Sequence, residues 1–163
     1  MKKGIIGGIA GLVVGILITL FTVYQMAPGL MIVEDQSKYG FEETVSRLEA
    51  SVTEHAWKMP AKHNLQKTMQ KFDYDVRPVQ VLELCKPDHA AKILEESEER
   101  VVSSMMPCRE AVYEKADGKT YISRMNSSLM AKTMSPVIQE VMGEAYAENE
   151  EIVKAVLQSK SSE

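Results

Sequence analysis

The residues of this 163-residue chain that are most able to do chemistry are Cys85 and Cys108, its only two cysteines. Cys85 follows the β-branched run 79–84, and Cys108 begins a second extended segment, so both are expected at strand ends. In an oxidising compartment an even cysteine count favours a disulfide, which would stabilise the fold by about 3 kcal/mol on the chain-entropy model. Two alternatives stay open: a pair of buried, inert thiols, or a redox or ligand-binding pair.

Methionine is the second residue type that could bind a ligand, since the chain has 11 methionines. Thioether and thiolate sulfurs select Cu(I), and Met or His can ligate haem iron. Met106 stands two residues before Cys108 and is the candidate partner for a copper or haem site there. The alternative is that methionines fill irregular gaps in the core, which the helical spacing of several of them favours.

Other chemical motifs and a cationic surface are missing from the sequence. There is no Cys-x-x-Cys-His, no Gly-x-Ser-x-Gly, no phosphate-binding glycine loop and no His-Glu-x-x-His. Beyond residue 30 the chain carries 17 basic and 23 acidic residues, which argues against nucleic-acid binding. A binding or accessory role is therefore expected rather than an enzyme.

The N-terminal stretch predicts a membrane anchor. Residues 4–25 contain no charge, and about 20 apolar residues at ~1.5 Å rise span a ~30 Å hydrocarbon core. A cleaved signal peptide is the alternative, but its apolar region usually has ~7–15 residues and ends at a small-x-small site, which residues 24–28 lack. Lys2 and Lys3 precede the span, so the positive-inside bias predicts a cytoplasmic N-terminus and a domain in the periplasm of a bacterial-type inner membrane.

Small residues mark one face of this predicted span. Gly7, Gly11 and Gly15 recur every four residues, so they share a helix face on which two backbones can approach closely. The alternative is that glycine is simply common in membrane helices. A contact here would join two copies of the chain or recruit a membrane-complex partner.

The elements that would position the candidate residues follow from periodicity and turn signals. Short strands are expected near 31–33, 57–59 and 79–84, and Asp117-Gly118 predicts a hairpin between 109–114 and 119–125. Helices are expected over 41–56, weakly over 63–72, over 88–95, and from 127 to about 158 with a break at Pro136. This order predicts an α+β fold: a small, mostly antiparallel sheet with helices packed on it, preceded by one N-terminal transmembrane helix.

The expected domain boundaries follow the same elements. Residues 1–27 form the transmembrane anchor, 28–36 the connection and first strand, 37–146 the domain, and 147–163 the end of the last helix and a frayed tail. A helix break is expected at Pro28-Gly29. Of the histidines, His55 and His89 are expected at the surface.

Several short motifs, in order, resemble the domain of unknown function 302 family. They are residues 37–45 (SKYGFEETV), 63–65 (HNL), 84–87 (LCKP), 106–108 (MPC) and 112–114 (VYE) before Asp117-Gly118. The resemblance covers about residues 31–145 and implies a small α+β fold and a tendency to form homodimers, but no settled biochemical role. It also adds His63, which lies in one of these motifs, to the candidate ligands. The chain departs from the family at Lys86, where Asn is common, and at Met105-Met106, where Leu is more usual.

Three functions are compatible with these features. The leading hypothesis is a single-span, membrane-anchored, extracytoplasmic binding or accessory module that forms homodimers and has an unknown ligand. The second is a redox, haem or metal protein that uses the Cys85/Cys108 region with His63 or Met106. The third is a structural subunit of a membrane complex, recruited by the glycine face and the acidic last helix.

Overall fold

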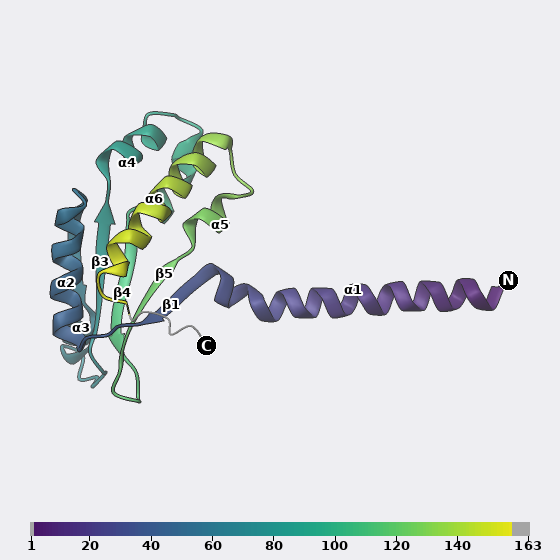
Figure 1. The fold of residues 1–163 in the computed structure, drawn as a ribbon, viewed down its shortest axis with the longest axis horizontal. Helices are drawn as coiled ribbons and strands as arrows, with labels where there is room; N and C mark the ends of the chain where they lie inside the picture. The colour runs from purple at the N-terminus through teal and green to yellow at the C-terminus, as the bar shows by residue number, and fades with distance from the viewer. Residues whose placement is uncertain (1, 158–163) are drawn as a thin grey trace.

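The computed structural model describes residues 2–157, and within the first helix it describes the side chains of residues 11–27 and 29–31. A long helix leads into a domain of one sheet and several helices (Figure 1). In chain order the elements are α1 (Lys2–Met31), β1 (Ile32–Gln36), α2 (Phe41–Glu54), β2 (Lys58–Asn64), α3 (Leu65–Gln70), β3 (Val79–Cys85), α4 (Pro87–Leu94), η1 (Glu99–Met105), β4 (Cys108–Glu114), β5 (Thr120–Met125), α5 (Ser127–Ala131) and α6 (Pro136–Lys154).

The strands form a five-stranded sheet with the order β1-β5-β4-β3-β2. Each neighbouring pair is antiparallel, which confirms the predicted α+β class. The β4–β5 hairpin turns at Asp117-Gly118, where Gly118 has a φ of 74°, a value that glycine adopts without a steric penalty. Pro60 lies in the edge strand β2, where its missing N–H costs no central ladder bond.

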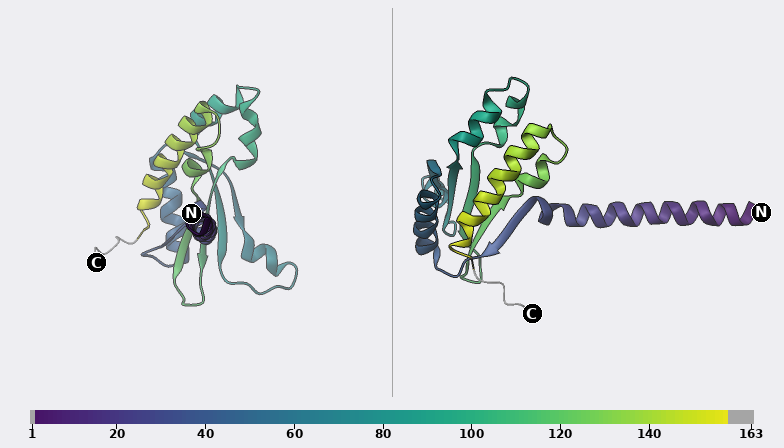
Figure 2. Two further views of the ribbon diagram at one scale, coloured as in Figure 1. Left: turned by 90° about the vertical axis from the view of Figure 1, so that its right-hand side faces the viewer. Right: turned by 45° about the horizontal axis from the view of Figure 1, so that its top comes forward.

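The main core lies between one face of the sheet, here called the inward face, and the helices α2 and α6. Phe41, Val45, Leu48 and Val52 recur at helical spacing and bury one side of α2. The strands contribute Leu82, Leu84, Val112 and Ile122, and α6 contributes Ile152, Val153 and Val156. Figure 2 shows α2 and α6 on the same side of the strands. The opposite face of the sheet, here called the outward face, carries His63, Val81, Glu83 and Arg109.

A second apolar cluster lies where α4, η1, α5 and the first half of α6 meet. Its buried members are Ile93, Val102, Ala131, Ile138, Val141 and Met142, with Met105, Met106 and Met134 packed against them. Asn126 caps α5 and Ser135 caps α6 through side-chain oxygens that accept backbone N–H groups. The domain therefore has two apolar clusters on one side of its sheet, with a boundary between them.

The structure corrects two local expectations. Helix α1 continues through Pro28-Gly29 and ends at Met31, directly before β1. His63 belongs to strand β2 and pairs with Val81, because the Asn64 side chain caps α3 and starts that helix only at Leu65. In α4 the buried apolar residue is Ile93, whereas Leu94 is 39% exposed.

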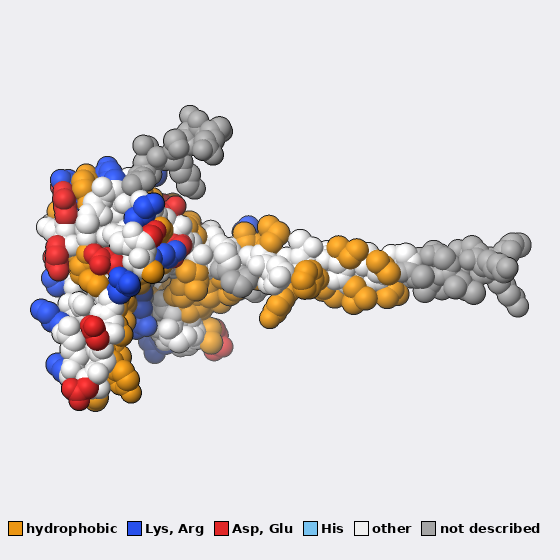
Figure 3. Space-filling view, turned by 90° about the horizontal axis from the view of Figure 1, so that it is seen from below, with side chains coloured by type: hydrophobic (Ala, Val, Ile, Leu, Met, Phe, Trp, Pro, Cys, Tyr) orange, Lys and Arg blue, Asp and Glu red, His pale blue; other side chains and the backbone are white. Residues whose placement is uncertain are grey.

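Helix α1 extends away from the domain, and its described apolar side chains are exposed from Leu12 to Met26 (Figure 3). Gly11 and Gly15 lie on this exposed stretch, whereas Gly7 falls outside the residues whose side chains are described. Among the residues that the structure describes, no helix combines the length and the apolar character needed to cross a membrane.

Candidate functional site

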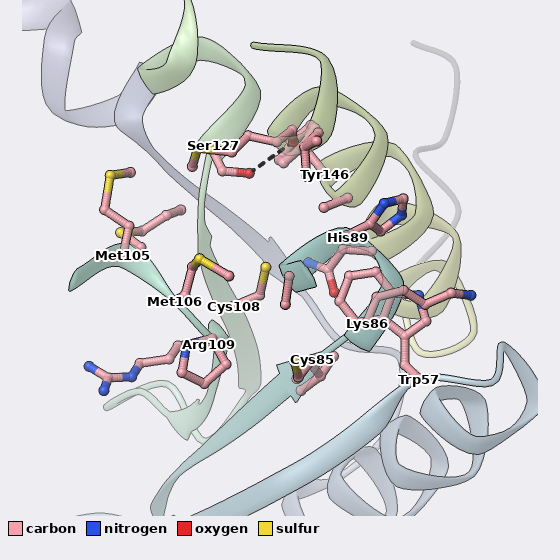
Figure 4. A pocket seen from close by; sticks show the side chains of 18 of the residues that line it. Trp57, Cys85, Lys86, His89, Met105, Met106, Cys108, Arg109, Ser127 and Tyr146 are labelled. Carbon is pink, nitrogen blue, oxygen red and sulfur yellow. Dashed lines mark hydrogen bonds between the residues drawn. The ribbon is translucent and has the colours of Figure 1, made fainter. Parts of the chain in front are cut away.

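A mostly apolar pocket lies at the boundary between the two apolar clusters (Figure 4). Its cavity measures about 60 Å³, and a single water needs roughly 10–15 Å³ on the same measure, so several water-sized groups fit inside. The lining side chains come from both clusters and from the ends of β3 and β4. They are Trp57, Leu84, Cys85, Lys86, His89, Ala90, Ile93, Met105, Met106, Pro107, Cys108, Arg109, Glu110, Met125, Ser127, Val141, Met142, Ala145, Tyr146 and Asn149.

Sheet register brings the distant segments of this pocket together. Leu84 of β3 stands opposite Cys108 of β4, so the end of one strand meets the start of the next. Pro87 then begins α4 directly after β3, because a residue without an N–H suits the first turn of a helix. The segment Met106-Pro107, with a cis peptide bond, connects η1 to β4 on the other side of the cavity.

The polar groups of the pocket are centred on Glu110 and Asn149. Glu110 points to the inward face of β4 and is 0% exposed. Asn149 Nδ2 donates a hydrogen bond of 2.5 Å to Glu110 Oε1, while Glu110 Oε2 and Asn149 Oδ1 have no partner among the described residues. Burial raises the pKa of Glu110 to about 8, against the opposing effects of the Asn149 bond and the nearby Arg124. At neutral pH this carboxyl group is therefore mainly protonated.

Arg124 stands opposite Glu110 in the β4–β5 register, but its side chain forms hydrogen bonds with two other carboxylates. Its Nε and Nη2 donate to Glu150 at 2.6 and 2.7 Å, and its Nη2 donates to Asp35 at 3.0 Å. The Arg124 side chain is only 2% exposed. Arg124 Nη1 has no hydrogen-bond partner in the described chain, so Arg124 acts on Glu110 through its charge and not through a hydrogen bond.

Glu148 of α6 contacts three residues that line the pocket. Trp57 Nε1 donates to Glu148 Oε2 at 2.9 Å, and His89 Nε2 lies 2.9 Å from Glu148 Oε1. Lys86 Nζ adds an ion pair at 3.3 Å. The expected surface position of His89 is therefore wrong: its side chain is 12% exposed and lines the pocket. The carboxylates at positions 144 and 148, one helical turn apart on α6, both lie within 4 Å of it.

Both cysteines are free thiols in the structure, so the disulfide is not formed. Burial, with smaller contributions from Glu110 and Cys85, raises the pKa of Cys108 to about 11. Burial also raises the pKa of Cys85. Because the thiolate is the reactive form, both groups are poor nucleophiles at neutral pH.

Family comparison now identifies the domain. A family model described as "Domain of unknown function DUF302" matches residues 33–156. The chain belongs to this family. Among solved structures, the crystal structure of an uncharacterized conserved DUF302 protein from Bacillus stearothermophilus shares the fold, with a TM-score of 0.70 and 22% identity over 78% of this chain and 98% of that one. None of the curated proteins matches this sequence.

The DUF302 domain brings three of the four predicted ligand residues to one site. Cys85, Cys108 and Met106 line the pocket, and Figure 4 shows Met106 beside Cys108, with Cys85 on the side of Trp57. His63 lies elsewhere: its Nε2 is 3.2 Å from Glu83 Oε1 on the outward face of the sheet. Among the residues described, no group of three or more His, Cys, Asp or Glu side chains is placed to hold a metal ion.

Sequence reasoning missed the polar groups of the DUF302 pocket, although one signal was present. In the strand Cys108-x-Glu110-x-Val112 the glutamate falls on the same face as the apolar residues. A charged residue at an inward position of an otherwise apolar strand face is unusual and marks a candidate site. Asn149 gave no such signal, because it lies among the glutamates of the acidic last helix.

Proposed function

We propose that this protein is a single-span, membrane-anchored, extracytoplasmic binding module whose DUF302 domain takes a small, mostly apolar ligand into the pocket. One observation carries the binding proposal. Glu110 Oε2 and Asn149 Oδ1 are buried without hydrogen-bond partners in the described chain, and both residues line the same cavity. An unpaired buried polar group costs about 1–3 kcal/mol, which a ligand with matching groups would recover.

A cavity-filling variant tests this proposal. Ala145 lines the pocket, whereas Ala147 lies two residues away on the exposed side of the same helix. Small organic fragments would be screened against the full chain in detergent micelles, with the fluorescence of Trp57, the only tryptophan, as the signal. We expect Ala145→Leu to abolish fragment binding and Ala147→Leu to retain it. An unchanged set of binding fragments in Ala145→Leu would contradict the proposal.

The membrane anchor is supported by the composition and exposure of α1. Residues 4–25 carry no charge, and the described apolar side chains between Leu12 and Met26 are about half or more exposed. The hydroxyls of Thr19 and Thr22 donate to the carbonyls of Gly15 and Ile18, each at 2.9 Å, so they need no water. External protease should remove the domain from intact spheroplasts, and complete protection would contradict this topology.

Homodimer formation through α1 is the second part of the proposal. A Cβ atom built on Gly11 or Gly15 meets nothing within 4 Å, so a larger side chain there fits the single chain. Gly11→Ile should therefore weaken dimers only by obstructing a partner helix. Val13→Ile, on the other side of the helix, is the matched control. Equal dimer fractions for the two variants in detergent, measured by light scattering, would contradict the contact.

A soft-metal site is a second candidate function, favoured by the sulfur atoms at the pocket. Met105, Met106 and Cys108 all contribute to its lining, and thioethers with a thiolate select Cu(I). The raised pKa of Cys108 opposes this function, since the metal would have to displace a firmly held proton. A haem would need far more space than the cavity of about 60 Å³ offers. Metal analysis and an absorption spectrum of protein extracted from membranes distinguish these possibilities.

A further inference from the structure

We propose that the pocket selects an uncharged group that both accepts and donates a hydrogen bond, such as a primary amide, and holds it between the Glu110 carboxyl group and the Asn149 side-chain oxygen. This inference rests on the binding function proposed above and specifies its ligand class. It follows from the charge balance around Glu110, from the position of its proton, and from the apolar character of the remaining walls.

The charge balance around Glu110 keeps this carboxyl group neutral. The charged or titratable groups around Glu110 come from every neighbouring element: Asp35 of β1, Cys85 of β3, Lys86 and His89 at the start of α4, Cys108 and Arg109 of β4, Arg124 of β5, and Tyr146 and Glu150 of α6. Arg124 is the cation opposite Glu110 and already binds two carboxylates, while Lys86 and Arg109 pair with Glu148 and Glu83. A charged Glu110 would add a third anion to one buried cation, which a fully buried site disfavours.

The hydrogen bond to Asn149 then determines where the proton of Glu110 lies. Oε1 accepts the Asn149 amide N–H, so the acid proton belongs on Oε2, which has no other partner. The site therefore presents one O–H donor from Glu110 and one acceptor from Asn149 Oδ1. The raised pKa of Glu110, about 8, agrees with a proton retained at neutral pH.

A primary amide satisfies this pair of groups at the same time. Its carbonyl accepts the Glu110 O–H, and its N–H donates to Asn149 Oδ1. A carboxylate has no donor for Asn149, and an ammonium has no acceptor for the Glu110 proton. The rest of the ligand would contact apolar walls that include Leu84, Ile93 and Val141. The cavity volume limits that part to a few carbon atoms.

Three matched probes test this selectivity on the full chain in detergent micelles. Isobutyramide, isobutylammonium and isobutyrate share one small branched carbon skeleton and differ in the polar group. Trp57 lines the pocket, so its fluorescence reports occupancy. At about pH 6.5 we expect isobutyramide to bind at least about tenfold more tightly than either ion. Its affinity should fall about tenfold by pH 9, as Glu110 loses its proton.

Variants at the two polar residues separate recognition from loss of structure. Glu110→Gln keeps a donor and an acceptor of the same shape, so it should bind isobutyramide within a few-fold of wild type and show no loss between pH 6.5 and 9. Asn149→Leu should lose amide binding. Glu83→Gln, on the outward face, should keep both the affinity and its pH dependence. Far-UV circular dichroism confirms that each variant is folded.

Two results would overturn the inference. They differ in whether the proposed binding function is also contradicted. In the first, isobutylammonium binds most tightly and Glu110→Gln loses this binding. That result would show that Glu110 is charged and that the pocket binds cationic ligands. Absence of binding by all three probes would overturn the amide class alone if other fragments still bind in a manner that Ala145→Leu abolishes. If no fragment binds, the proposed binding function falls as well.

Discussion

The two faces of the sheet place the same residue types in opposite environments. Arg124 of β5 points inward, is 2% exposed and binds Asp35 and Glu150. Arg109 of the neighbouring strand points outward, is 60% exposed and lies 3.3 Å from Glu83. The glutamates repeat the contrast, since Glu110 is fully buried beside Asn149, whereas Glu83 lies between His63 and Arg109. Side-chain alternation along a strand therefore decides which of two similar residues is buried among partners and which stays exposed.

The largest expected effect comes from removing one arginine on each face. Arg124→Met leaves Asp35 and Glu150 without their shared cation, so we expect a loss of roughly 3–5 kcal/mol in the free energy of unfolding. Arg109→Met removes an exposed pair and should cost less than about 1 kcal/mol. Urea denaturation of the full chain, followed by Trp57 fluorescence, measures both. Equal losses would show that the two faces do not differ energetically in this way.

The second prediction concerns the pH dependence of stability. The pKa of Glu110 is raised in the folded state to about 8 from its ordinary value of 4.5, so its stabilising contribution is complete below pH 4.5 and is lost as the pH rises through 8. Glu110→Gln should remove this loss, gaining on the order of a few kcal/mol relative to wild type between about pH 5 and 9. Glu83→Gln should retain the wild-type profile. Parallel profiles for wild type and Glu110→Gln would contradict a buried, neutral Glu110.

The third prediction compares the two cysteines. The pKa of Cys108 is raised to about 11, and Cys85 is less deeply enclosed, so iodoacetamide should modify Cys85 at least about ten times faster at pH 8. Mass spectrometry of native, non-reduced protein follows both sites. Recovery of a Cys85–Cys108 disulfide would contradict the free thiols of the structure.

Much of the fold followed from local sequence signals. Apolar spacing predicted α2, the Asp117-Gly118 turn predicted the β4–β5 hairpin, and Pro87 and Pro136 mark helix starts where a missing N–H is harmless. These signals act within a few residues, so they can be read without knowing the tertiary structure. The pairing order β1-β5-β4-β3-β2 could not be read in this way, because it depends on contacts between distant segments.

The site was only partly predictable for the same reason. Cys85, Cys108 and Met106 were found because cysteine and its neighbours are conspicuous in any sequence. Glu110 and Asn149 become informative only when α6 packs on β4 and both lose contact with water. The sequence shows α6 only as an acidic helix, yet its Glu148 and Glu150 form hydrogen bonds with residues of other elements. Helical periodicity indicates a polar face but not what that face contacts.

The prediction with the smallest expected effect concerns His63, the one predicted ligand residue that lies outside the pocket. His63 is half-exposed and contacts Glu83 on the outward face, so His63→Ala should change the free energy of unfolding by less than about 0.5 kcal/mol. It should also leave isobutyramide binding unchanged. His89→Ala is the matched comparison, because it removes a pocket side chain and one of the partners of Glu148, at a cost of about 1–2 kcal/mol and with weaker probe binding. A larger effect on binding from His63→Ala than from His89→Ala would return His63 to the ligand site and place that site on the outward face of the sheet.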